Sequence, residues 1–334
     1  MKSIVFFNNK GGVGKTTLLC NIASIFALEF GKKVLVIDTD PQCNSTTYCI
    51  SEEEVEKLYT KPKRNTIEVF FEPLKKGKGY LDTTIPPIKT KRFGFDLIPG
   101  DPKLSLREDL LASDWKSATS GDARGLQTNF VIKDLLLKYS NDYDYIFIDV
   151  GPSLGALNRS ILIASDYYVV PMSVDMFSLS AIENISISLE KWEQSISRSL
   201  ELHEEEENDK FMINGQEITW SLKFIGYAVQ QYTAKTVSGS KRPVRAYERI
   251  NKKIPSLISK YLLKEQDGDI ENFKLGEIQN LHSLVPLSQS ANCPIFKLKS
   301  SDGVVGAHFT MVKDAKNIFE NIAIKIQKQM EAIK

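Results

Sequence analysis

The chain has 334 residues, of which 42% are hydrophobic and 25% charged, as in an ordinary soluble globular protein with a large core. Its formal net charge of +1 excludes a general field that recruits nucleic acid or membrane, so any such binding must come from local patches. No stretch is long enough to span a bilayer, and the apolar run at the N-terminus is too short for a signal-peptide core. The four cysteines form no Cys-x-x-Cys pair, which indicates reduced structural thiols and a cytoplasmic protein.

Near-continuous apolar runs recur along the chain, as expected for parallel strands that are covered on both faces. Segments with apolar residues at helical spacing separate several of them. This alternation predicts an α/β fold: a doubly wound, mostly parallel sheet with helices on both faces and ligands at the carboxyl ends of its strands. The predicted strands are 3–7, 32–38, 95–99, 143–149, 167–172 and 222–229, and the predicted helices are 16–30, 103–111, 126–139 and 179–195.

We interpret residues 1–334 as a single domain with two insertions. The segment at about 65–91, with its Lys, Gly and Pro clusters, is predicted to be a loosely structured excursion. The segment at about 199–220 is acidic and weakly patterned, which favours a solvated loop or hairpin. The C-terminal segment, residues 313–334, has apolar residues on one face of a helical pattern: Ile318, Ile322, Ile326, Met330 and Ile333. We expect it to form a closing helix packed on the sheet, rather than a helix on a membrane surface.

The stretch FFNNKGGVGKTTL, residues 6–18, joins a short apolar run to a glycine-rich turn and the start of a helical pattern. Such an arrangement directs backbone N–H groups and the positive end of the helix at one point, which suits a di- or triphosphate. The stretch departs from the common pattern G-x-x-x-x-G-K-[ST]. Asn9 stands where the first glycine is expected, and an additional lysine, Lys10, follows it.

The other loop residues have the expected chemistry. Gly11, Gly12 and Gly14 let the backbone close around phosphates without a Cβ in the way. Lys15 can place its ammonium against the β and γ oxygens, and the hydroxyl of Thr16 is positioned to ligate Mg²⁺.

Phosphoryl transfer also needs carboxylates that hold the metal's water shell and orient the attacking water. Asp149 ends the apolar run YIFID, which is the Walker B position. Asp38 and Asp40, in VIDTDPQ, follow the second predicted strand at the same edge of the sheet. The sequence therefore predicts three acids beside the glycine loop.

With these motifs in place, the chain resembles the ParA/MinD group of P-loop ATPases, which have a deviant Walker A motif, and especially the ParA (Soj-like) partition branch. The resemblance rests on KGGVGKTT, DTDPQCNST and YDYIFIDVGPSLG, and it becomes loose after about residue 240. It implies a P-loop NTPase fold, ATP and Mg²⁺ as ligands, and an ATP-dependent homodimer. It also implies nonspecific DNA binding, a role in plasmid or chromosome partition in the nucleoid, and slow hydrolysis stimulated by a ParB-like or other activating partner protein.

In this group the extra lysine, here Lys10, reaches across the dimer to the phosphates bound by the other subunit. A cation delivered in this way neutralises charge on the transferred phosphoryl group, as an arginine finger does. By the same resemblance, Asp40 positions the attacking water and Thr17 contacts the α-phosphate. The implied residues are Lys10, Lys15 and Asp40 for catalysis; Lys10, Gly11, Gly12, Val13, Gly14, Lys15, Thr16 and Thr17 for ATP; and Thr16, Asp38 and Asp149 for Mg²⁺.

The chain departs from the group at two places. Relatives often have two prolines after the Walker B aspartate, whereas Gly151 replaces the first proline here, which predicts a more flexible segment. Where relatives usually have IPR near the adenine, our alignment places Leu281, His282 and Ser283, so His282 is the candidate base contact.

Between residues 235 and 264, Glu248 is the only acid among nine basic residues. Such a run can neutralise several phosphates and give sequence-independent, salt-dependent DNA binding, although a solvated helix face is the alternative. The candidate DNA contacts are Lys235, Lys241, Arg242, Arg245, Arg249, Lys252 and Lys253. Operator-specific binding is not expected, since no helix-turn-helix precedes the first strand.

Other classes fit the sequence less well. A MinD-like membrane ATPase needs a basic amphipathic C-terminal helix beyond the core, and the iron–sulfur relatives need cysteine pairs. Ligases of the dethiobiotin synthetase type generally lack the signature lysine. A different possibility is an ATP-switched scaffold that recruits a protein effector in a defence or conjugation system without DNA cargo. The acidic segment at about 199–220 keeps this alternative open.

Overall fold

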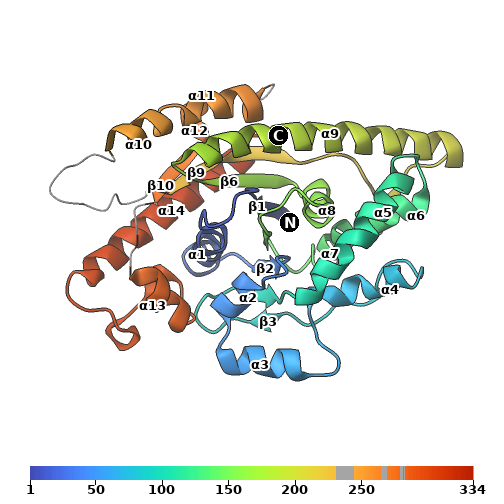
Figure 1. Cartoon of the computed structure of the whole chain (residues 1–334). Coiled ribbons are helices and arrows are strands. Elements are labelled where there is room, and N and C mark those ends of the chain that lie inside the picture. Colours follow the sequence, from blue (N-terminus) through green and yellow to red (C-terminus); the bar gives the residue numbers. More distant parts are fainter. Residues whose placement is uncertain (231–243, 265–268, 279–280, 282, 334) are drawn as a thin grey trace.

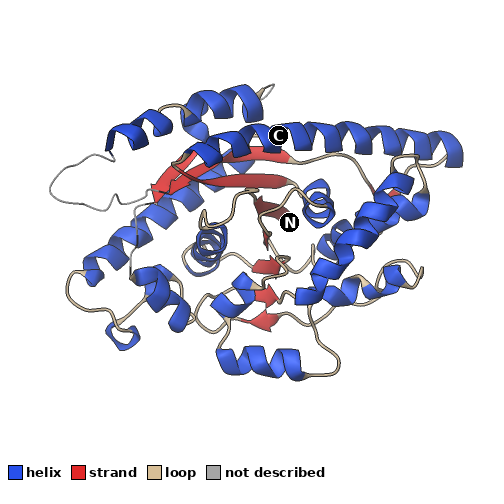
Figure 2. Ribbon diagram, viewed as in Figure 1, coloured by secondary structure: helices blue, strands red, loops and turns tan. Residues whose placement is uncertain are grey.

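The computed structural model describes residues 1–230, 244–264, 269–278, 281 and 283–333 (Figure 1). An eight-stranded sheet runs through the centre in the order β10-β9-β6-β1-β5-β2-β4-β3 (Figure 2). Neighbouring strands are parallel, except that β3 runs antiparallel to β4. The strands are β1 (Lys2–Phe6), β2 (Val34–Asp38), β3 (Ile88–Lys89), β4 (Asp96–Ile98), β5 (Tyr145–Asp149), β6 (Tyr167–Ser173), β9 (Lys223–Gln230) and β10 (Lys274–Ile278), and a separate hairpin pairs β7 (Met212–Ile213) with β8 (Gln216–Glu217).

Helices cover both faces of the sheet (Figure 2). The α-helices are α1 (Lys15–Leu28), α2 (Asn44–Cys49), α3 (Glu52–Thr60), α4 (Glu72–Lys75), α5 (Glu108–Ala118), α6 (Ala123–Asn129), α7 (Val131–Lys138), α8 (Ala156–Ala164), α9 (Met176–Glu207), α10 (Val244–Asn251), α11 (Ile254–Ile258), α12 (Ile270–Phe273), α13 (Leu284–Ser290) and α14 (His308–Ala332). Shorter 3₁₀ or π turns are η1 (Ile67–Phe70), η2 (Pro102–Arg107), η3 (Ser259–Leu263), η4 (Ile295–Lys297) and η5 (Ser300–Asp302). Within the described residues, no helix combines the length and the apolar character needed to cross a bilayer.

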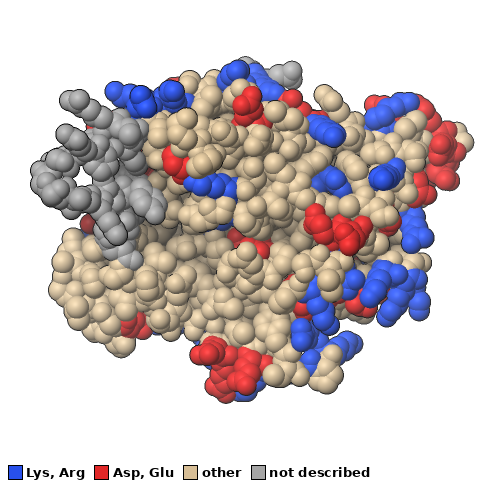
Figure 3. Space-filling model, viewed as in Figure 1, with Lys and Arg blue, Asp and Glu red and all other residues tan. Residues whose placement is uncertain are grey.

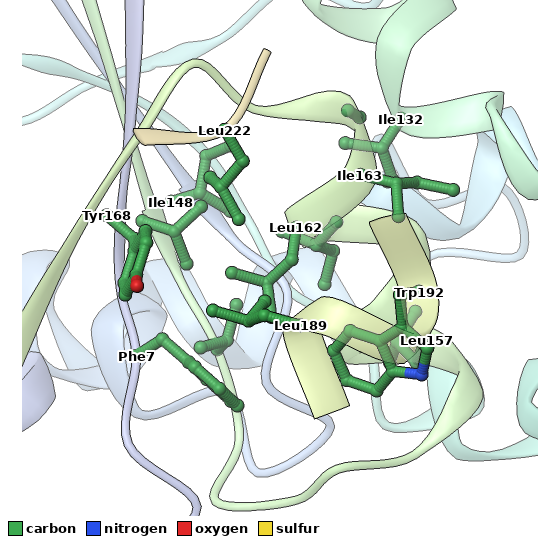
Figure 4. Packing of buried hydrophobic residues seen from close by; sticks show 14 of the residues in the cluster. Phe7, Ile132, Ile148, Leu157, Leu162, Ile163, Tyr168, Leu189, Trp192 and Leu222 are labelled. Carbon is green, nitrogen blue, oxygen red and sulfur yellow. The ribbon is translucent and has the colours of Figure 1, made fainter. Parts of the chain in front are cut away.

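The alternation of side chains along each strand divides the core into two layers. On β1, Ile4 and Phe6 face the layer under α1 and α14. Val5 and the next residue after the strand, Phe7, face the layer under α7, α8 and α9. Figure 4 shows the second layer, where Leu157 and Leu162 of α8 and other apolar side chains pack beside Trp192 of α9. Burial on both faces explains why the strands appear in the sequence as continuous apolar runs.

The predicted fold class is confirmed, and so are the six predicted strands, with boundaries that differ by a few residues. Two strands were missed. β10 is half-buried and contains Gly276, which interrupts its apolar pattern, and β3 has only two residues. The closing helix was correctly predicted: α14 buries Phe319, Ile322 and Ile326 in the layer that contains α1.

The two predicted insertions are more ordered than expected. Residues 65–91 contain η1, α4 and β3, and they bury Phe70, Phe71 and Ile85 in the core, so the prediction of a loosely structured excursion was wrong. In the acidic segment, α9 continues to Glu207 before the β7–β8 hairpin begins, so only its second half is the predicted hairpin. Ile196, Ser199 and His203 are the buried residues of this extension, and they hold it against the body of the protein.

Candidate functional site

A cavity of about 380 Å³ opens at the carboxyl edge of the sheet, where the loop between β1 and α1 faces α2 and α13. Its volume lies in the range of small-molecule sites. The predicted loop therefore lies at the cavity, and one wall comes from residues far away in the sequence. The lining residues are Gly11, Gly12, Gly14, Lys15, Thr16, Thr17, Asp40, Gln42, Asn44, Thr47, Tyr48, Pro152 and Gln289.

The loop conformation depends on its glycines and on Asn8. Gly12 and Gly14 both have φ of 72°, in the left-handed region that favours glycine. A Cβ on Gly14 would lie 2.5 Å from the side-chain nitrogen of Gln230, at the end of β9. The buried amide of Asn8 donates to the Pro171 carbonyl at 2.8 Å and accepts from the Lys10 backbone N–H at 2.9 Å. Asn8 thus ties the loop to β6, a role that the sequence pattern did not reveal.

Lys15 is buried, and its charge faces one acid at the end of β5 and another just after β2. Burial lowers the pKa of its ammonium, while the charges of Asp149 and Asp40 act in the opposite direction. Its Nζ donates to the Lys10 carbonyl at 3.3 Å. Thr16, the next residue, donates from its hydroxyl to Asp149 Oδ2 at 2.7 Å. A cation, a hydroxyl and acids therefore meet at the start of α1, as the sequence predicted.

Asp38 and Asp149 end the paired strands β2 and β5 and are fully buried. Asp38 Oδ2 accepts from the Thr46 backbone N–H at 2.8 Å and from its hydroxyl at 2.6 Å. Asp149 Oδ2 accepts from the Ser45 hydroxyl at 2.5 Å. Burial, followed by repulsion from Asp149, raises the pKa of Asp38 to about 8, and burial also raises the pKa of Asp149 to about 6. Two buried acids without a cation between them are electrostatically unfavourable.

This donor set fits a magnesium ion. Asp149 Oδ1 is buried and has no hydrogen-bond partner among the described residues, although a bound cation or its water would satisfy it. The described part of the chain contains no group of three or more His, Cys, Asp or Glu side chains placed to cage a metal. Mg²⁺ is commonly held by one or two carboxylates, water and substrate phosphates, with no protein cage. Thr16, Asp38 and Asp149 are the residues that would hold it.

Replacing Asp38 by asparagine is expected to stabilise the nucleotide-free protein. Because the folded-state pKa of Asp38 lies above its ordinary value of 3.8, folding at neutral pH requires this buried carboxyl to take up a proton, which costs stability. We expect Asp38→Asn to raise the melting temperature by about 2–5 °C at neutral pH. The gain should shrink as the pH falls from about 8 toward 4, because the proton that Asp38 takes up on folding is then bound at a smaller cost. Calorimetry across this pH range measures the effect, and an unchanged melting temperature would contradict it.

Lys10 is held within its own subunit. Its Nζ forms an ion pair with Asp175, which is followed directly by α9, and donates to the Ser173 hydroxyl at 3.0 Å. Asp175 also caps α9, since its Oδ1 accepts from the backbone N–H groups of Phe177 at 2.9 Å and Ser178 at 3.1 Å. Burial raises the pKa of Asp175, but hydrogen bonds from Lys10 and other donors outweigh it, so the pKa is lowered. The Asp175 carboxylate is therefore ionised at neutral pH.

Asp40 lines the cavity, and only 5% of its surface is exposed. Its Oδ1 accepts from the Gln42 backbone N–H at 2.9 Å, and its own N–H donates to Asp38 Oδ1 at 3.2 Å. A Cβ on Gly151 would lie 3.3 Å from Asp40 Oδ1, which is tight. The glycine that replaces the usual proline thus leaves room for the Asp40 carboxylate, a consequence that differs from the flexibility we predicted.

Gln289 approaches the cavity from α13, and sequence reasoning missed it. A buried polar network holds α13 against α1 and α2: Tyr48 Oη and Ser288 Oγ are 2.6 Å apart, and Asn21 Nδ2 donates to Tyr48 Oη at 3.1 Å. Asn292 adds a hydrogen bond of 2.8 Å to the Ile50 carbonyl. The network therefore fixes the part of α13 that carries Gln289, whose own side chain is exposed, and no local motif marks this residue. His282, the predicted base contact, lies outside the described residues.

Three of the predicted DNA contacts have described side chains. Arg249 lies on α10, Lys252 and Lys253 lie just before α11, and all three are exposed. Figure 3 shows basic side chains gathered over these two helices. Lys235, Lys241, Arg242 and the side chain of Arg245 lie outside the described residues.

All four cysteines, Cys20, Cys43, Cys49 and Cys293, are buried and free, as expected for structural thiols.

Comparisons with known proteins agree with this geometry. Residues 1–202 match the family model described as "AAA domain". Chromosome partitioning protein ParA of Caulobacter vibrioides is 28% identical over 204 residues, which cover 60% of this chain and 67% of that protein. The crystal structure of protein DIP2308 from Corynebacterium diphtheriae is 32% identical with a TM-score of 0.68, covering 87% of this chain and 97% of that one. The structure of pNOB8 ParA bound to nonspecific DNA is 20% identical with a TM-score of 0.58, covering 100% and 99% of the two chains.

Proposed function

The chain belongs to the ParA/MinD group of P-loop ATPases, and from this membership we propose that it is an ATP-dependent dimerising switch that binds DNA nonspecifically in its ATP state. The observation that supports the proposal best is the meeting of the glycine loop with Asp38, Asp40 and Asp149 at one edge of the sheet. This arrangement matches the needs of phosphoryl transfer, which depends on positioning and electrostatic stabilisation.

Each residue has a proposed role. The loop backbone and Lys15 bind the phosphates, with Thr17 at the α-phosphate. Thr16 ligates Mg²⁺, and Asp38 and Asp149 hold its waters. The bound ion would neutralise charge on the phosphates. Asp40 orients the attacking water from the cavity wall.

Lys10 completes the site of a second subunit. In the isolated subunit it is paired with Asp175, so it must leave this partner before it can reach phosphates in trans. ATP would then join two subunits, and hydrolysis would let them separate.

We propose that the basal rate of ATP hydrolysis is slow and that a ParB-like or other partner protein stimulates it. We also propose that the protein acts in DNA partition, in the cytoplasm and on the nucleoid.

Nonspecific DNA binding is supported by the exposed basic residues Arg249, Lys252 and Lys253, in and just after α10, and by the DNA-bound ParA relative. The decisive experiment measures binding to a random-sequence duplex with ATP, with ADP and without nucleotide, over a salt series. We expect tight binding only when ATP is present. The logarithm of the association constant for DNA should fall by about 0.9 per contacted phosphate for each unit of log salt concentration. Protein that dimerises with ATP and binds no DNA would instead favour the effector-recruiting scaffold.

Gln289→Leu is expected to weaken ATP binding about tenfold and to reduce any preference for ATP over GTP. The side-chain amide offers one donor and one acceptor, which match the N6 amino group and N7 of adenine, whereas guanine presents two acceptors there. Titration calorimetry with both nucleotides measures the change. Gln194→Leu, at an exposed position of α9, is the matched control. If Gln289→Leu and Gln194→Leu bind ATP with equal affinity, Gln289 does not recognise the base. That result would leave the proposed ATP-dependent switch unaffected.

A further inference from the structure

A second cavity, of about 440 Å³, lies between the connection 61–66, α4 and the start of η2. None of its lining residues lines the first cavity. Its volume is in the range of small-molecule sites. The segment that builds most of it is the one that the sequence had suggested to be loosely structured, and the proposed switch uses none of its residues.

The carboxylates in its floor are already paired. Arg107 is buried and donates from Nε to Glu68 Oε2 at 3.1 Å and from Nη2 to Glu72 Oε1 at 3.2 Å. Asp101, which is 1% exposed, accepts from the Thr66 hydroxyl at 2.9 Å and from the Lys103 backbone N–H at 3.0 Å. These bonds hold the carboxylates in place and occupy several of their acceptor sites.

The rim is cationic. Lys63, Lys78 and Lys103 are exposed, and none of them has an ion pair among the described residues. Arg64 and Lys76 also line the cavity, each 3.7 Å from a carboxylate of the floor, a separation that leaves donors free. Figure 3 shows Lys and Arg side chains gathered around α4 on this face. Several cations around one concavity attract a multiply charged anion.

One wall is apolar. Val69 and Leu81 are half-buried, with part of each side chain packed against the hydrophobic core, and Pro73 of α4 lies beside them. Inorganic phosphate needs no such surface. An organic group attached to a phosphate would bury apolar area here while its phosphates meet the rim.

We propose that this cavity binds an organic diphosphate, with the phosphates on Lys63, Lys78 and Lys103 and the organic part against Val69 and Leu81. Ammonium groups bind phosphate oxygens through charge-assisted hydrogen bonds. The concave shape and the apolar wall favour a small ligand over the backbone of a nucleic acid, which would not use the apolar wall.

The test uses ADP as the organic diphosphate and the full-length Lys15→Ala protein, so that the glycine loop contributes little to binding. Calorimetry compares this protein with one that also carries Lys63→Gln, Lys78→Gln and Lys103→Gln. A matched control carries Lys116→Gln, Lys313→Gln and Lys328→Gln, which remove the same charge at exposed positions elsewhere. Adenosine, pyrophosphate and a random-sequence DNA duplex serve as further probes.

We expect ADP to bind once, with affinity reduced at least about tenfold by the rim substitutions and unchanged in the control. Pyrophosphate should bind more weakly than ADP, and adenosine should not bind measurably. Absence of ADP binding, or an equal loss in the control, would overturn the proposal. DNA binding that depends on the same lysines and competes with ADP would overturn it in favour of a nucleic-acid surface. Because Lys15 is replaced throughout, none of these outcomes bears on the ATP switch.

Discussion

Asp40→Ala is expected to lower the rate of ATP hydrolysis by about 10²–10⁴, the range for a residue that handles the proton of the nucleophile. ATP binding and ATP-dependent dimerisation should persist, because Asp40 is not among the residues that would hold the phosphates or Mg²⁺. The substituted protein should therefore accumulate as an ATP dimer. Single-turnover hydrolysis and sedimentation with ATP measure the two properties separately.

The control is Asp82→Ala, which removes a carboxylate from an exposed position away from the cavity. Gly151→Ala tests the same geometry while keeping the Asp40 carboxylate, since its Cβ would lie 3.3 Å from Asp40 Oδ1. Relieving this contact moves the Asp40 carboxylate by a few tenths of an ångström, so we expect a measurable loss of rate that is smaller than the loss in Asp40→Ala. If Asp40→Ala hydrolyses ATP at the rate of the parent protein, another residue must orient the water.

The sequence was informative where function depends on local patterns. The strands that carry Asp38 and Asp149 are continuous apolar runs, and the glycine loop has a characteristic spacing, so their meeting at one sheet edge could be predicted. The ion pair between Lys10 and Asp175 and the place of Gln289 could not. Both depend on contacts between residues far apart in the chain, and neither Asp175 nor Gln289 belongs to a motif with fixed spacing. The prediction of a loosely structured excursion at residues 65–91 was wrong because it rested on the lysine and glycine clusters. It gave too little weight to the aromatic residues of the segment, which are buried in the core.

Lys10→Ala and Asp175→Asn are expected to affect the switch in opposite directions. Lys10→Ala should retain ATP binding and lose about 10³-fold or more in hydrolysis by the dimer, the scale of a missing arginine finger. Asp175→Asn should release Lys10 while it keeps the cap of α9, because asparagine is as good an N-cap as aspartate. Dimerisation with ATP should then become tighter, because Lys10 is no longer paired with an acid of its own subunit and can reach the other subunit without breaking that pair.

The expected gain in dimer affinity on Asp175→Asn can be estimated from the solvent exposure of the two paired side chains. The side chains of Lys10 and Asp175 are 27% and 35% exposed, so the pair resembles a surface ion pair, which contributes roughly 0.5–1 kcal/mol. A symmetric dimer breaks two such pairs, and their release corresponds to about 5- to 30-fold tighter dimerisation. Glu206→Gln, on the far part of α9, is the control for lost negative charge. An Asp175→Asn protein that folds normally and dimerises no more tightly than this control would show that the pair does not restrain Lys10. Tighter dimerisation that vanishes when Lys10→Ala is added would identify the lysine as the group released.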